Sequence, residues 1–158
     1  MEPASIAEIK KRINELSPKA LKEVCLRLIK YKKENKELIS YLLFYADSEE
    51  TYINEIKEEM NIAFDEINQG NLHWAKKSVR KILRNTNKHC KYSGNKQTEV
   101  ELLYHFCKLM KQHIKGFSRN PTLLNIYQRQ ITKIQKDIQS LHEDLQFDYT
   151  EMMAEITM

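Results

Sequence analysis

The sequence predicts an all-α fold of antiparallel helical hairpins, with about seven helices forming a bundle or a short solenoid and ending in a long C-terminal helix. Apolar residues recur every three or four positions along most of the chain, which is the period of an amphipathic helix. No segment alternates apolar and polar residues with β-branched enrichment, so no strand is predicted. The few prolines and glycines stand at the ends of periodic runs rather than inside them.

The first four predicted helices lie before residue 69. The first opens with the capping pattern Ser5-x-x-Glu8, and the second begins at Pro18 after the N-cap Ser17. The third covers 36–46, and its apolar run LISYLLFYA falls short of the roughly 20 residues that a bilayer span needs. The fourth follows Asp47-Ser48 over 48–68 and is strongly acidic; the third and fourth are also compatible with one continuous helix.

The last three predicted helices begin at Asn71, at Thr98-x-x-Glu101 and at Pro121 after the N-cap Asn120. The final helix, over 121–146, carries a heptad pattern of apolar residues, which is typical of a helix that packs along one partner helix. We expect this pattern to form a self-association seam in a homodimer, or else to pack within its own domain. The seam consists of Leu124, Tyr127, Ile131, Ile134, Ile138, Leu141 and Leu145.

Length and composition indicate one helical domain over 1–147, followed by an acidic, Met-rich tail over 148–158 that we expect to be either loose or an adaptable contact. The three cysteines are an odd number without a CxxC motif, which favours reduced thiols and a cytoplasmic protein. The N-terminal segment lacks the apolar stretch of a secretory signal. We therefore expect no membrane partner.

The helix after Asn71 belongs to a segment, 71–98, with eight lysines and arginines and no acidic residue. At 100° per residue, its cations fall on the side opposite its apolar residues. They can contact nucleic acid or an acidic partner, or they can pair with the acids of helix 48–68. The candidate contact residues are His73, Trp74, Lys76, Lys77, Arg80, Lys81, Arg84, Lys88 and Lys91.

Reactive side chains form no catalytic signature. Glu101 and His105 share a helix face and offer two metal ligands, but the spacing supplies no third one. Cys90 and Cys107 are interpreted as small core residues. Glycine-rich phosphate loops are absent from the sequence, so we predict no catalytic residues, no cofactor and no metal.

Two local resemblances accompany these patterns. The stretch INQGNLHWAKKSVRKIL, within 53–84, resembles the turn and second helix of a tetratricopeptide repeat, with Gly70 and Ala75 at the small interhelical positions. Glu59 and Glu66 replace the aromatic residues of that repeat, so the resemblance implies only a helical hairpin. The segments LKEVCLRLIKYKKENKELISYLLF, RKILR and TEVELLYHF resemble a bacterial family of small helical proteins, a resemblance that implies no activity.

These patterns together favour a non-catalytic helical module for protein–protein interaction, whose partner is another protein or a second copy. The alternative is a nucleic-acid-binding protein that uses the basic helix 72–92.

Overall fold

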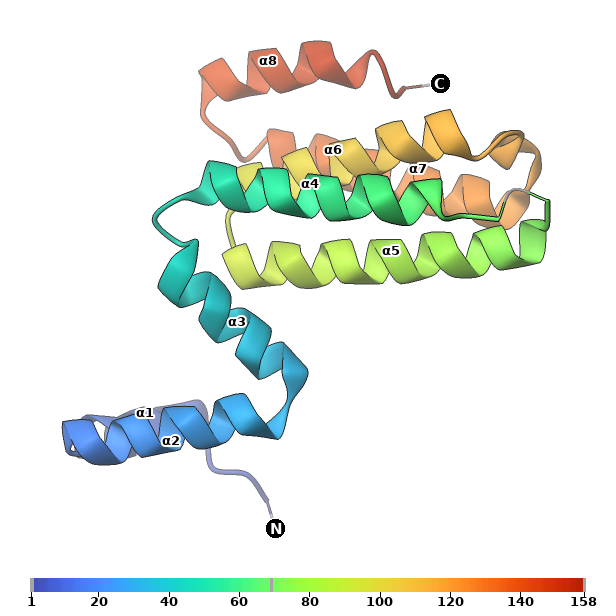
Figure 1. The fold of residues 1–158 in the computed structure, drawn as a ribbon. Coiled ribbons are helices and arrows are strands. Elements are labelled where there is room, and N and C mark those ends of the chain that lie inside the picture. Colours follow the sequence, from blue (N-terminus) through green and yellow to red (C-terminus); the bar gives the residue numbers. More distant parts are fainter. Residues whose placement is uncertain (1, 69, 158) are drawn as a thin grey trace. The chain divides into compact units, whose positions relative to one another are not determined.

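The computed structural model describes residues 2–68 and 70–157, and within them the chain is helical without any strand (Figure 1). The all-α prediction is confirmed. The helices are α1 (Ile6–Asn14), α2 (Pro18–Tyr31), α3 (Lys33–Phe44), α4 (Glu49–Asp65), α5 (Leu72–Ser93), α6 (Lys96–His113), the 3₁₀ helix η1 (Phe117–Arg119), α7 (Pro121–Ile138) and α8 (Glu143–Met153).

The chain divides into two compact units, residues 1–43 and residues 44–158. This differs from the single domain expected over 1–147. The structure also separates α3 from α4, because the chain turns over 45–48 before α4 begins.

Unit 1–43 contains α1, α2 and nearly all of α3. The predicted capping box is present, since the Ser5 hydroxyl accepts a bond from the Glu8 amide at 3.3 Å and the Glu8 carboxylate accepts one from the Ser5 amide at 2.9 Å. The Ser17 hydroxyl likewise caps α2, at 3.3 Å from the Ala20 amide. Neither α1 nor α2 buries any residue.

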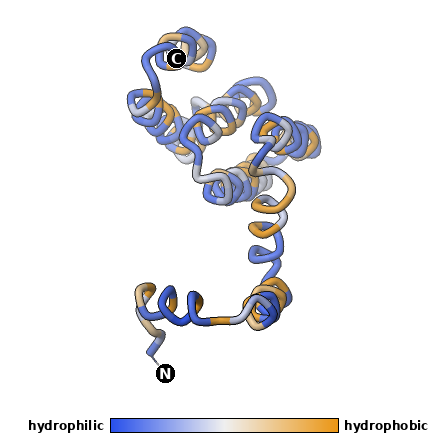
Figure 2. The backbone as a smooth tube through the Cα atoms, turned by 90° about the vertical axis from the view of Figure 1, so that its left-hand side faces the viewer, coloured by the Kyte–Doolittle hydropathy of each residue, from blue (hydrophilic) through white to orange (hydrophobic). Residues whose placement is uncertain are grey.

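Unit 44–158 is built around α6, which packs against α4, α5 and α7. Figure 2 looks along these helices, which lie roughly parallel or antiparallel to one another. Phe64 of α4 and Phe106 of α6 are fully buried and meet edge-on, with ring centroids 5.6 Å apart. Figure 1 shows α4 and α5 side by side and antiparallel, which is the hairpin geometry expected over 53–84.

The C-terminal region departs from the sequence prediction. α7 ends at Ile138 instead of running to 146, and His142 begins the separate helix α8. The expected loose tail is attached to the core: Ile156 is fully buried, and the Tyr127 hydroxyl donates to its carbonyl. The side chains of Tyr104 and Lys108 both bond the Glu155 carboxylate, at 2.8 and 3.0 Å.

The start of α6 also differs. Asn95 caps the helix by accepting from the Gln97 amide at 2.9 Å, so α6 begins at Lys96, two residues before Thr98. Gly94 caps the end of α5 with φ of 66°, and Gly116 precedes η1 with φ of 70°; a side chain would be strained at both positions.

Candidate binding surfaces

The basic helix α5 has an apolar inner side that faces the core and a cationic outer side. Asn71 caps its first turn, accepting from the amides of His73 at 2.9 Å and Trp74 at 3.3 Å. Its inner side buries a line of residues against α4 and α6. These are Ala75, Val79, Ile82, Thr86 and Cys90.

The outer side is the cationic face, defined as Lys76, Lys77, Arg80, Lys81, Arg84, Lys88 and Lys91. Lys76 and Lys88 are half-buried, whereas the other five are exposed. Among the residues that the structure describes, six of the seven have no carboxylate within ion-pair distance: Lys76, Lys77, Arg80, Lys81, Arg84 and Lys91.

Several acids of α4 have partners other than the cationic face. The Glu55 carboxylate accepts from the Tyr45 hydroxyl at 2.7 Å, and Asp65 lies 3.6 Å from His113. Glu49 accepts from the hydroxyls of Ser93 and Thr98. Pairing with helix 48–68 therefore does not account for the six cations.

Aromatic side chains flank the cationic face at its N-terminal end. Trp74 is 53% exposed, and its ring lies 5.2 Å from Nζ of Lys77 and edge-on to His73. Such an exposed indole beside cations can stack on a planar ligand. At the other end, Tyr92 is half-buried against His89.

Unit 1–43 carries a second candidate surface, formed by apolar residues whose exposure to solvent the sequence did not predict. Apolar residues on α1 and α2 recur at intervals of three, four and three positions, which defines one seam on each helix. All eight are 37% to 85% exposed. The open seams are Ile6, Ile9, Ile13 and Leu16 around α1, and Leu21, Val24, Leu28 and Tyr31 on α2.

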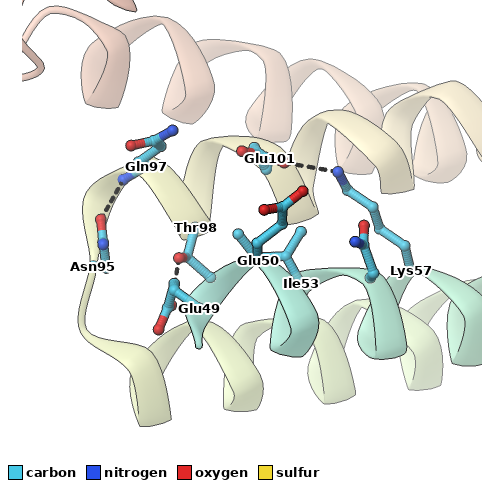
Figure 3. A pocket seen from close by; sticks show the side chains of 9 residues that line it. Glu49, Glu50, Ile53, Lys57, Asn95, Gln97, Thr98 and Glu101 are labelled. Carbon is cyan, nitrogen blue, oxygen red and sulfur yellow. Dashed lines mark hydrogen bonds and ion pairs between the residues drawn. The ribbon is translucent and has the colours of Figure 1, made fainter. Parts of the chain in front are cut away.

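A polar pocket of about 470 Å³ lies between the N-terminal parts of α4 and α6 (Figure 3). Its polar groups already serve the fold: Lys57 pairs with Glu101 at 2.7 Å, and Thr98 donates to Glu49. The lining contains neither a cysteine nor a histidine. It is lined by Glu49, Glu50, Ile53, Asn54, Lys57, Asn95, Gln97, Thr98 and Glu101.

The other reactive side chains do not converge on a site. His105 donates to Asn61 at 2.8 Å, while Glu101 engages Lys57 and Tyr149. Burial raises the pKa of the Cys90 thiol to about 12 and that of Cys107 well above its usual range, so both thiols stay protonated in the core. No group of three possible metal ligands occurs within the described part of the chain.

The heptad seam of the last predicted helix faces inward. Tyr127, Ile134 and Ile138 are buried, and α7 packs along α6. These three positions pack within their own chain. Leu124, Ile131, Leu141 and Leu145 are half-buried, the last two beyond the end of α7.

Comparisons of the chain with protein-family models, with curated proteins and with solved structures found no match. Over residues 2–68 and 70–157, no helix is both long and apolar enough to cross a membrane.

Proposed function

We propose that the chain is a non-catalytic protein–protein interaction module that binds its partner through the open seams of α1 and α2. One observation carries this proposal: two amphipathic helices present regular apolar seams, yet neither helix buries a residue.

The energetic argument follows from burial. Fully burying a fully exposed Ile or Leu side chain contributes about 1.5–3 kcal/mol. The eight large apolar residues of the two seams are 37% to 85% exposed, so covering each of them contributes a corresponding fraction. Segments of about 40 residues rarely stabilise a core alone and commonly need a disulfide, a metal or association. Cys25, the cysteine of this unit, is a free thiol, so no disulfide supplies this stability, whereas association through the seams would.

Unit 44–158 has a hydrophobic core of its own. Its core includes Phe64, Leu102, Phe106 and Leu123, all fully buried, and its C-terminal residues are bonded to that core. The three free thiols fit a reducing compartment, and we place the module in the cytoplasm on that basis.

Site-specific photo-cross-linking in the cells that make the protein tests this function. A photoreactive residue at Leu28, on the α2 seam, should give a discrete protein adduct, whereas one at Lys30, on the other side of α2, should not. Ile13→Asp should remove the adduct without loss of helicity, because Ile13 is exposed. The same adducts from positions 28 and 30, or nucleic-acid adducts alone, would overturn the proposal.

A second candidate function is the binding of single-stranded nucleic acid along α5. It is favoured by the cationic face, whose exposed members lack internal ion pairs, and by the exposed Trp74 beside it. A fluorescence titration with Trp74 as the probe tests it.

A further inference from the structure

We infer that the partner of the open seams is an amphipathic helix whose own apolar seam is flanked by acidic residues. This inference rests on the proposed function and adds the chemistry of the partner to it.

The inference starts from the register of the seams. With Ile6 and Ile13 at a positions and Ile9 and Leu16 at d positions, the flanking e and g positions of α1 include Lys10 and Arg12. The same register on α2, with Leu21 and Leu28 at a, places Arg27 and Lys32 at flanking positions, Lys32 lying just past the end of the helix.

Within α1, α2 and Lys32, the C-cap of α2, every charged residue at these flanking positions is therefore a cation. The acids Glu8, Glu15 and Glu23 occupy c positions, turned away from the seams. Lys10 and Arg27 have no ion pair among the described residues, and Arg12 has only an exposed one, with Glu15 at 2.7 Å. Residues 1–43 hold ten lysines and arginines against six glutamates, so the surroundings of the seams are positive as well.

In a helix pair, e and g residues contact the flanks of the partner's seam and select which helix binds. A second copy would bring cations against cations, which disfavours self-pairing. A different partner helix, whose seam is flanked by Glu or Asp, would instead place acidic side chains against the cations of α1 and α2. Each exposed pair changes affinity only about two- to three-fold, but several pairs at one seam act together.

The full-length chain can be tested with two labelled synthetic helical peptides of about four heptads, both with Leu at a and d. One carries Glu and the other Lys at every e and g position. By fluorescence anisotropy, the Glu peptide should bind at least about tenfold more tightly than the Lys peptide. The variant Lys10→Glu/Arg12→Glu/Arg27→Glu/Lys32→Glu should reverse this preference.

A matched variant separates local contacts from overall charge. Lys11→Glu/Lys19→Glu/Lys22→Glu/Lys30→Glu makes the same change of charge at exposed positions outside the seams, and should keep the preference for the Glu peptide. Equal reversal by both variants would overturn the inference, because the preference would then follow net charge alone.

The remaining outcomes distinguish this inference from the proposed function. Equal binding of both peptides overturns the acidic-partner rule but leaves the seams as the contact surface. If neither peptide binds, the helical-partner inference is wrong, and the proposed function then depends on the cross-linking at Leu28. Two further outcomes would overturn the inference. One is a stable dimer of the chain that does not bind the peptides, and the other is a chain that binds phosphatidylserine vesicles but neither peptide.

Discussion

Nζ of Lys57 on α4 lies 2.7 Å from Oε2 of Glu101 on α6, and the other carboxylate oxygen of Glu101 accepts from the Tyr149 hydroxyl of α8 at 3.0 Å (Figure 3 shows the Lys57 pair). One carboxylate thus links three helices of unit 44–158. The Lys57 and Glu101 side chains are only 27% and 23% exposed, so water screens this pair less than a surface pair.

Replacing Glu101 should therefore cost more stability than replacing Lys57. Glu101→Ala removes both bonds and leaves Tyr149 without this partner, which should lower the free energy of unfolding by about 1–3 kcal/mol. Lys57→Met keeps the Tyr149 bond and should cost about 1 kcal/mol or less. Urea denaturation followed by circular dichroism measures both. Equal losses for the two variants would show that the bond to Tyr149 contributes nothing.

The stability of the protein should depend on His105 in weakly acidic solution. Burial, followed by the Lys57 cation, lowers the pKa of His105 below its ordinary value of 6.5. The unfolded chain consequently takes up this proton first as the pH falls. The contribution of neutral His105 is complete above about pH 6.5 and is lost as the pH falls from there toward the lowered pKa.

His105→Gln should therefore lose less stability than the parent between pH 7 and pH 5. Gln keeps an amide donor for Asn61 but does not titrate in this range. Urea midpoints measured every half pH unit give the two profiles. Parallel profiles would show that the protonation of His105 is not coupled to folding.

Because the α7 seam faces inward, the stability lost on substitution should depend on how deeply each seam residue is buried. Ile134 is fully buried, so Ile134→Ala should cost about 2–5 kcal/mol, whereas the half-buried Ile131→Ala should cost less. Ile138→Asp should unfold unit 44–158, because it places an unpaired charge in the core. A soluble, helical Ile138→Asp monomer formed from a dimeric parent, as seen by sedimentation, would instead place Ile138 at a subunit interface.

The sequence located the helices mainly through their capping residues. Ser5, Ser17, Asn71 and Asn120 each accept a backbone bond at the predicted start of a helix, because a side-chain oxygen there satisfies an otherwise free amide. The start of α6 was misplaced because Asn95 competes with Thr98 for the cap. The Thr98 hydroxyl donates to Glu49 of α4 instead, a tertiary contact that local pattern does not contain.

The break between α7 and α8 has no proline or glycine to mark it, and the heptad spacing continues across it. Side chains stabilise this turn: the Ser140 hydroxyl donates to the Asp137 carbonyl at 2.7 Å, and the Gln146 amide donates to the Leu141 carbonyl at 2.7 Å. Such local bonds offer the backbone an alternative to the helical hydrogen bonds, and the heptad pattern does not register them.

The candidate surfaces were predictable to different degrees. The cationic face follows from the composition of 71–98 and from helical periodicity, whereas the lack of ion pairs at its exposed members depends on tertiary packing. The seams of α1 and α2 were recognisable as apolar faces. Whether they would be covered was not predictable, because burial depends on how the whole chain packs.

Trp74 provides a direct test of nucleic-acid binding, because it is the single tryptophan of the chain and lies exposed beside the cationic face. Oligothymidylate should quench its fluorescence by stacking, and the affinity should fall with salt with a slope of about −0.7 per neutralised phosphate. Arg80→Glu/Arg84→Glu should weaken binding on the order of tenfold or more, since it reverses two phosphate contacts.

Arg129→Glu/Lys136→Glu makes the same change of charge at exposed positions of α7 and should bind like the parent. Inorganic polyphosphate, which has no bases, should bind without this quenching. The absence of quenching at low salt, or equal weakening by both double variants, would exclude the cationic face as a specific site for single strands.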